Sequence, residues 1–222
     1  MGLSGVSADN LAAVQAAITA KDNGGGETDT LVKLQAVITA AVTAYNNALT
    51  AISAAAEANN ADGTSPAASV YADAGVLGVD ASNLEAINSA LNSAAINGEA
   101  ANTAGEIQTI VNAYNAILAR ANDVDTAAGN NTADTAAAPT APQYAAVGAT
   151  IGAAATDAEN LTLLNDIVGA SQKADVNTVG EIDELARIAN ALQTIAAGGT
   201  PSPALTDADY AKVGLSGVSA DN

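Results

Sequence analysis

A sequence repeat is the feature that most constrains this 222-residue chain. The nonapeptide GLSGVSADN occupies residues 2–10 and recurs unchanged at residues 214–222. Weaker copies begin at residue 75, as GVLGVDASNL, and at residue 148, as GATIGAAATDAENL. Self-similarity at a regular spacing of this size is typical of arrays of small structural units. The sequence therefore predicts three related units of about 70 residues, followed by the opening of a fourth.

Large apolar residues recur at intervals of three and four within each unit, which predicts amphipathic helices. Each unit has a long stripe: Leu31, Leu34, Ile38, Val42, Tyr45, Leu49 and Ile52; then Ile107, Ile110, Val111, Tyr114, Ile117 and Leu118; then Ile182, Leu185, Ile188, Leu192 and Ile195. A shorter stripe precedes each one: Leu11, Val14 and Ile18; Leu84, Ile87 and Leu91; Leu161, Leu164 and Val168. A third, short helix is expected around each of Tyr71, Tyr144 and Tyr210. The predicted fold is all-α, with tandem three-helix-bundle repeats forming an elongated array.

The loops between these stripes divide the chain. Segments 22–29, 59–65, 125–139 and 198–203 are rich in Gly, Asn, Asp, Thr and Pro, as loops are. We predict repeat 1 at residues 2–58, repeat 2 at 66–124, repeat 3 at 141–197, and the start of repeat 4 at 206–222. Repeat 1 then lacks its own Tyr helix. We expect the segment to come from a longer array whose period is 212 residues.

Cap residues are predicted at the helix ends. Four pairs have the spacing of a capping box: Thr103 with Glu106, Thr178 with Glu181, Thr156 with Glu159, and Thr140 with Gln143. Ser65 before Pro66 is expected to cap the Tyr helix of the second unit. Gly75, Gly148 and Gly214 follow the Tyr helices, where a left-handed stop is expected. The repeated glycines then form a corner, and Ser7, Asp80, Thr156 and Ser219 are expected to cap the helix after it.

The apolar content leaves little material for a core. Of the 109 nominally hydrophobic residues, 58 are Ala and only 45 are Leu, Ile or Val. At about 25 cal/mol per Å² of buried apolar surface, one such unit is marginally stable by itself. Alanine compensates through its high helix propensity and by letting helices approach closely. We also expect neighbouring units to stabilise one another, as stacked repeats do.

Composition excludes several function classes. The chain has no Cys, His, Trp or Phe, which removes thiol and imidazole nucleophiles and zinc sites. A formal net charge of −18 argues against nucleic acid and anionic membrane surfaces as partners. No run of 18 apolar residues predicts membrane insertion. We therefore expect no enzyme activity and no cofactor, and we predict no catalytic, cofactor-binding or metal-ligating residue.

Four sets of residues are nonetheless candidate sites. Asp22, Asn23, Glu27 and Asp29 could ligate calcium, but they lack the spacing of a calcium loop, so weak calcium binding is an open alternative that the sequence does not predict. Carboxylate pairs such as Glu181 with Glu184 and Asp207 with Asp209 fit first helical turns, where negative charge is favourable. The five Tyr residues fit buried packing with a hydrated hydroxyl. Asn130 and Asn160 begin glycosylation-type triplets that we interpret as chance matches.

Two segments of the third unit resemble a known family. QYAAVGATIGAAATDAENLTLLNDIV at 143–168 and NTVGEIDELARIANAL at 177–192 are similar to the GA module, a three-helix bacterial surface domain that binds serum albumin. YAKVGLSGVSADN at 210–222 shares its glycine corner. The resemblance implies a three-helix bundle. No binding residue is carried over, because the second-helix positions read AAVQAA, EAINSA and TLLNDI, which offer few anchors.

The chain as a whole resembles another class of protein. Near-identical tandem copies, the absence of Cys, the acidic bias and the Ala, Asn and Thr richness are similar to the extender repeats of very large bacterial surface adhesins. That resemblance implies a structural, non-catalytic spacer at the bacterial cell surface or outside the cell, with neighbouring repeats of the same chain as its partners. The alternative is a GA-like domain that binds a host serum protein.

Overall fold

The computed structural model describes residues 3–21, 24–59, 65–121 and 136–218, and every regular element in these ranges is helical. The all-α prediction is therefore confirmed. The α-helices are α1 Leu11–Thr19, α2 Leu31–Ala58, α3 Ala68–Asp73, α4 Leu84–Leu91, α5 Ala104–Arg120, α6 Ala141–Ala146, α7 Ala158–Ala170, α8 Val179–Ala196 and α9 Asp207–Lys212. The 3₁₀ helices are η1 Gly98–Ala101, η2 Gly152–Ala155 and η3 Lys173–Asp175.

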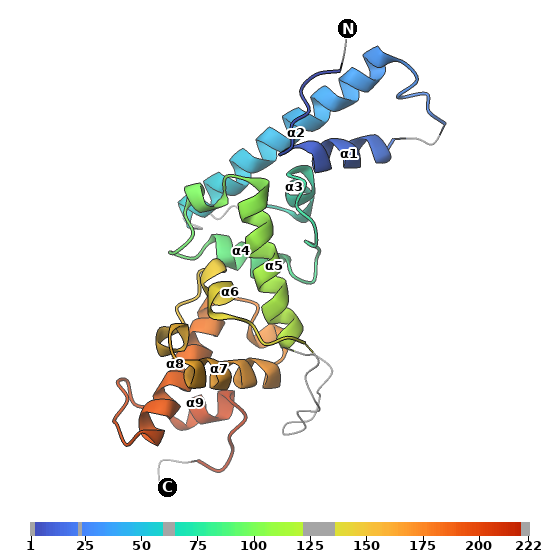
Figure 1. Cartoon of the computed structure of the whole chain (residues 1–222). Coiled ribbons are helices and arrows are strands. Elements are labelled where there is room, and N and C mark those ends of the chain that lie inside the picture. The colour runs from blue at the N-terminus through green and yellow to red at the C-terminus, as the bar shows by residue number, and fades with distance from the viewer. Residues whose placement is uncertain (1–2, 22–23, 60–64, 122–135, 219–222) are drawn as a thin grey trace.

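Helix α2 spans 28 residues, about 42 Å at 1.5 Å per residue, and takes part in two cores. Its N-terminal half packs against α1 around a small cluster of Val14, Ile38 and Ala41. Its C-terminal half contributes Ala48 and Ile52 to a second, larger cluster. The two clusters are therefore connected by one uninterrupted helix, which runs across the N-terminal end of the molecule in Figure 1.

The larger core continues through the rest of the described chain. It includes Ile107 and Tyr114 of α5, Leu164 of α7 and Ile182 of α8, all with no exposed surface. The helices lie one after another along a single direction, so the two termini are at opposite ends of an elongated molecule (Figure 1). Apolar packing thus continues from the C-terminal half of α2 to α8, and the small cluster between α1 and the N-terminal half of α2 is separate from it.

The short Tyr-containing helices connect neighbouring parts of the array. Each packs against the long helix that precedes it in sequence: α3 against α2, α6 against α5, and α9 against α8. The buried tyrosines of α3 and α6 also contact the helix that follows, as described below. Helices α3 and α6 therefore each pack on both sides of a junction.

The helix ends confirm some predicted caps. Thr103 and Thr178 accept a hydrogen bond from the amides of Glu106 and Glu181, and both capping boxes are complete. At Thr140, the amide and the hydroxyl both donate to Oε1 of Gln143, at 2.8 and 2.9 Å. Acidic and amide side chains in these first turns therefore satisfy backbone groups that the helix leaves unpaired.

Other predicted caps were wrong. Asp157, and not Thr156, caps α7, because the glycine corner of the third unit is longer and the extra residues form η2. Ser7 and Asp80 lie one turn before their helices, which begin after Asn10 and Asn83. Ser65 likewise precedes α3, whose N-cap is Ala67. Ser219 lies outside the described residues.

The predicted left-handed stops are confirmed. Gly75, Gly148 and Gly214 have φ angles of 72°, 80° and 76°. A side chain is strained in this region, and only glycine adopts it readily. The chain therefore turns at the end of each Tyr helix and enters the corner that leads to the next helix.

Candidate functional site

A buried hydrogen-bond network joins each of the Tyr helices α3 and α6 to the helix after it. The hydroxyl of Tyr71 donates to Oδ1 of Asn88 in α4 at 2.6 Å, and Nδ2 of Asn88 donates to the carbonyl of Pro66 at 3.1 Å. Tyr71 has no exposed surface. The asparagine amide thus holds together the start of the Tyr helix, its tyrosine and the following helix.

The same network recurs in the next unit. Tyr144 donates to Oδ1 of Asn165 in α7 at 2.8 Å, and Nδ2 of Asn165 donates to the carbonyl of Pro139 at 2.9 Å. Tyr144 and Pro139 lie 73 residues after Tyr71 and Pro66. We call these two sets the Tyr–Asn–Pro joints. In each, the tyrosine hydroxyl and both Oδ1 and Nδ2 of the asparagine are hydrogen-bonded in a largely buried place, which makes the docking geometry specific.

Burial determines the state of the tyrosines. Desolvation raises the pKa of Tyr71, Tyr114 and Tyr144 far above the ordinary value, so their hydroxyls stay protonated and act as donors. Tyr114 donates to the carbonyl of Val176 at 3.2 Å, which ties α5 to the loop before α8. The prediction of buried tyrosines is confirmed for these three and for Tyr45, whereas Tyr210 is only partly buried. For Tyr71, Tyr114 and Tyr144 the expectation of hydrated hydroxyls was wrong, because protein atoms accept their protons.

A glutamine clamp holds the glycine corner of the first two units. The amide of Ser4 donates to Oε1 of Gln35 at 2.9 Å, and Nε2 of Gln35 donates back to the carbonyl of Ser4 at 3.0 Å. Leu77 and Gln108 repeat both bonds, at 2.8 and 3.0 Å. In both units the partners lie 31 residues apart. One side chain of the long helix therefore satisfies both backbone groups of the turning residue.

The third unit replaces this clamp. Asp183 accepts from the amide of Thr150 at 2.6 Å, and a carboxylate has no proton to return to the carbonyl. Asn190 donates to the carbonyl of Ile151 at 3.0 Å, as Asn115 donates to the carbonyl of Gly78 at 3.1 Å in the second unit. In the third unit an aspartate thus takes the place of the glutamine, and the asparagine contact is kept.

Polar contacts also cross between units at a distance from the joints. At the end of α5, Nε of Arg120 donates to the carbonyl of Asn165 in α7 at 3.1 Å, and its guanidinium approaches Asp166 at 3.5 Å. The amide of Val179, at the start of α8, donates to the hydroxyl of Ser89 in α4 at 2.9 Å. These contacts place α7 and α8 against the unit before them.

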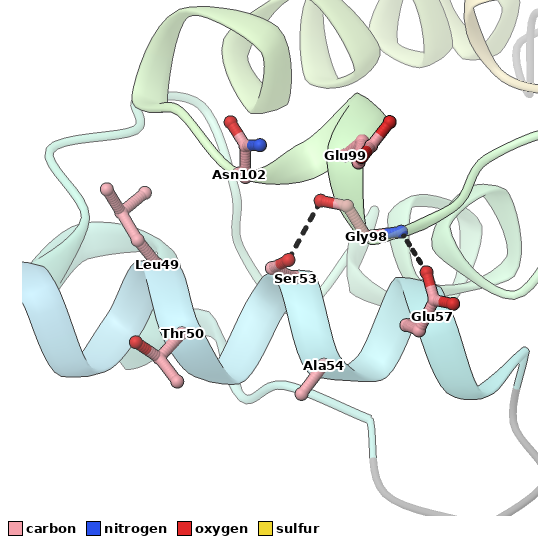
Figure 2. A pocket seen from close by; sticks show the side chains of 8 residues that line it. All are labelled: Leu49, Thr50, Ser53, Ala54, Glu57, Gly98, Glu99 and Asn102. Carbon is pink, nitrogen blue, oxygen red and sulfur yellow. Dashed lines mark hydrogen bonds between the residues drawn. The ribbon is translucent and has the colours of Figure 1, made fainter.

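A shallow groove marks the junction of α2 with η1 (Figure 2). The hydroxyl of Ser53 donates to the carbonyl of Gly98 at 2.8 Å, and the amide of Gly98 donates to Oε2 of Glu57 at 2.9 Å. A Cβ added at Gly98 would lie 2.9 Å from the carbonyl oxygen of Ser53. Because Gly98 has no side chain, η1 can pack closely against α2. The side chains of Ser53 and Glu57 are thus both bonded to the backbone of Gly98.

The carboxylate pairs considered from the sequence have structural partners. Glu181 closes the capping box of α8, and Glu184 receives two hydrogen bonds from Arg187, which holds the pKa of that carboxyl below its usual value. Arg187 also forms an ion pair with Asp209 of α9. The backbone amide of Thr206, with a smaller contribution from Arg187, lowers the pKa of Asp209. Asp207 accepts from the amide of Ala208 at 3.0 Å. Glu181 and Glu184 line one hollow together with Asp175 and Lys212, and neither Asp207 nor Asp209 lines it.

The calcium alternative falls partly outside the described residues, which include neither Asp22 nor Asn23. Glu27 lies 3.5 Å from Nζ of Lys21, and Asp29 lies 2.8 Å from Nζ of Lys33. These two carboxylates therefore face lysines. Within the described part of the chain, no group of three or more acidic, Cys or His side chains is arranged to hold a metal ion.

One of the two glycosylation-type triplets lies within the described residues. Asn160 lies in the first turn of α7, where its backbone and side-chain nitrogens both donate to Asp157. Asn130 lies outside the described residues.

Across the described ranges, none of the helices combines the length and apolarity needed to cross a bilayer.

The joint and clamp residues were missed by sequence reasoning. Asn88, Asn165, Gln35 and Gln108 are polar residues on helices, and nothing local distinguishes them from solvated positions. The signal was in the repeat: Gln108 follows Gln35 by 73 residues, as Leu77 follows Ser4. Aligning the units position by position would have found the polar residues that recur in register.

Comparison with known proteins found no relative of this chain. No protein-family model matches the chain, and neither a curated protein nor a solved structure matches it. The protein is thus described as an all-α chain with recurring polar joints.

Proposed function

We propose that this chain is a structural extender of a bacterial surface adhesin, located outside the cell and without catalytic activity. Its partners are neighbouring units of the same kind. Its helices form three-helix units, and the packing of each Tyr helix on the preceding long helix suggests a grouping of α1–α3, α4–α6 and α7–α9. This grouping differs in phase from the sequence-based boundaries, which begin each unit at its Tyr helix.

The continuous core is the observation that carries the proposal. A spacer must maintain its end-to-end distance. Units joined by flexible linkers would behave as a random coil, whose end-to-end distance is shorter. Here apolar packing continues from the C-terminal half of α2 to α8, and the Tyr–Asn–Pro joints lie within it. Bending at a joint would expose apolar surface and break buried hydrogen bonds. These features support a stiff connection between units.

The described polar groups support the same proposal. Threonine and carboxylate side chains satisfy helix starts, and buried tyrosines and asparagines satisfy the joints. The net charge of −18 keeps such a chain soluble and opposes non-specific association with acidic surfaces. Adhesive specificity would then reside in another part of the parent protein.

Small-angle X-ray scattering tests this proposal. Chains containing one, two and three copies, joined so that Val213 is followed by Gly2, should give a maximum dimension that rises linearly with copy number. The cross-sectional radius should stay constant. A maximum dimension that rises much more slowly, or a cross-section that thickens with each copy, would contradict an extender. Saturable binding of a serum protein to the single chain would favour the GA-like alternative.

A further inference from the structure

Helix α1 is held on α2 by a smaller core than the one that holds its counterpart α4 in the second unit. The α1–α2 cluster consists of Val14, Ile38 and Ala41, and it is separate from the larger cluster. Val14 corresponds to Ile87 of α4, and Ala41 to Tyr114 of α5, each 73 positions later and without exposed surface. The first unit therefore has a smaller side chain at both of these positions, and less apolar area is buried between its helices.

A polar contact between α4 and α5 also has no equivalent in the first unit. Nδ2 of Asn83, the residue before α4, donates to Oδ1 of Asn115 in α5 at 2.7 Å. The corresponding residues of the first unit are Asn10 and Val42, and a valine side chain has no acceptor for this bond. The clamp of the first corner does reach α2, but both of its hydrogen bonds are exposed. Apolar contact therefore supplies most of the attraction between α1 and α2.

That apolar contact is incomplete, because a hollow of about 430 Å³ lies between the two helices. Its lining includes Ala16 and Ala17 of α1 and Ala40 and Ala44 of α2. At the position of Ala44, α5 has Ile117, which is fully buried. Space that no side chain fills contributes no dispersion contacts, so α1 is loosely held on this side.

The unit that follows α2 packs away from this hollow. Helix α2 has 28 residues, whereas α5 has 17, and the following unit packs on the C-terminal half of α2. Gly75 accordingly lies against Ala13 near the start of α1, whereas Gly148 lies against Ser93, beyond the end of α4. The rest of α1 is not covered by the second unit. Undocking of α1 therefore leaves both Tyr–Asn–Pro joints intact.

We infer that α1 is a releasable segment, which undocks from α2 and returns while the larger core stays folded. Local opening of this kind occurs where buried apolar contacts are few. In the extender proposed above, on which this mechanical role rests, a pull along the chain frees α1 first. The chain then lengthens without loss of the larger core.

Cysteine labelling tests the opening, because the chain has no cysteine of its own. Val14→Cys and Ile87→Cys place a single thiol at the same position of α1 and α4, where the native residues are 2% and 0% exposed. A thiol-specific aromatic disulfide should label Val14→Cys at least about tenfold faster than Ile87→Cys. The substitution at Ile87 removes more buried volume, so it favours opening of α4 and works against the expected order.

The comparison is made in the single chain and in the second of two copies joined so that Val213 is followed by Gly2. A complete unit precedes α1 in the joined form, and the same order of labelling is expected there. Low urea should accelerate labelling of Val14→Cys weakly and that of Ile87→Cys steeply, because the urea dependence of an opening scales with the surface that it exposes. Equal rates in either form, or the same urea dependence at both thiols, would overturn the inference.

A second substitution tests the contribution of the hollow. Ala44→Ile places in α2 the side chain that Ile117 provides in α5, so it should slow the labelling of Val14→Cys. Ala51→Ile, at an exposed position of the same helix, is the matched control and should leave the rate unchanged. An Ala44→Ile variant that is labelled as fast as its parent would also count against the inference. None of these outcomes alters the scattering of joined copies, which tests the extender proposal separately.

Discussion

Tyr71 donates its hydroxyl hydrogen to Asn88 across 2.6 Å in a place without water access, and Tyr144 repeats this bond to Asn165 at 2.8 Å. Nδ2 of each asparagine donates a second hydrogen bond, to the carbonyl of a proline at the start of the Tyr helix. A fully satisfied buried polar network favours one packing over alternatives of similar apolar area. In an alanine-rich core with little shape to distinguish one register from another, the joints supply that specificity.

Removing one joint hydroxyl should destabilise the chain. Tyr144→Phe keeps the ring but leaves Oδ1 of Asn165 buried without its donor, so the free energy of unfolding should fall by about 1–3 kcal/mol. Urea denaturation followed by circular dichroism measures this change. Tyr210→Phe is the matched control, because Tyr210 is only partly buried, and it should change stability little. Equal effects of the two substitutions would mean that the joint has no special role.

The glutamine clamp predicts a graded series at one position. Gln108→Leu removes both bonds to Leu77 and should lower the free energy of unfolding by about 1 kcal/mol, in the range of a solvent-accessible hydrogen-bond pair. Gln108→Glu can still accept from the amide of Leu77 but cannot donate to its carbonyl, so it should lose less. Chemical denaturation at neutral pH compares the three proteins. Identical stability of all three would remove the clamp as a stabilising feature.

Two glycines with the same backbone conformation should respond differently to alanine. A Cβ at Gly148 would lie 2.0 Å from Oγ and 2.8 Å from Cβ of Ser93, whereas a Cβ at Gly214 meets nothing within 4 Å. Gly214→Ala should therefore lower the free energy of unfolding by only about 1–2 kcal/mol, the strain of the left-handed backbone. Gly148→Ala should lower it further.

Thermal and urea unfolding of both alanine variants would check this order. Ser93→Gly combined with Gly148→Ala should recover part of the loss, because it removes the clashing atoms. An equal loss at both glycines would mean that strain, and not contact with Ser93, determines the effect.

Acid should release α9 from α8. The pKa of Asp209 and that of Glu184 are lowered in the folded protein, by the Thr206 amide and by Arg187 respectively. A lowered folded pKa means that the stabilisation is complete above the unfolded pKa, about 4 for both groups, and is lost as the pH falls through the folded values. The amide resonance of Leu215, which donates to Tyr210, should shift as the pH falls below about 4 and α9 undocks.

The variant Asp209→Asn provides the control for this titration. It removes one of the two carboxylates and the ion pair with Arg187, so the resonance should already be displaced toward its acid position at neutral pH. The remaining acid transition should be smaller. A wild-type resonance that does not change over this range would show that the ion pairs do not hold α9.

The corner in the third unit shows where pattern reasoning failed. The sequence places GATIGAAATDAENL in register with GVLGVDASNL, and Thr156 with Glu159 has capping-box spacing. The extra residues form η2, which moves the cap to Asp157. Local spacing alone did not distinguish two neighbouring cap candidates, because the choice depends on where the preceding turn ends.

Periodicity by itself determined that the chain is helical and where the apolar stripes lie, because a 3.6-residue period is a property of the backbone and the order of side chains. The left-handed glycines after Tyr71 and Tyr144 were likewise local, since their conformation depends on the residue itself. Only the tertiary structure decided which helix accepts the hydrogen bond of each joint tyrosine and which glutamine clamps each corner. It also decided where along α2 the smaller core cluster ends and the larger one begins. Those contacts join residues far apart in the chain, and their energies depend on burial, which no local pattern specifies.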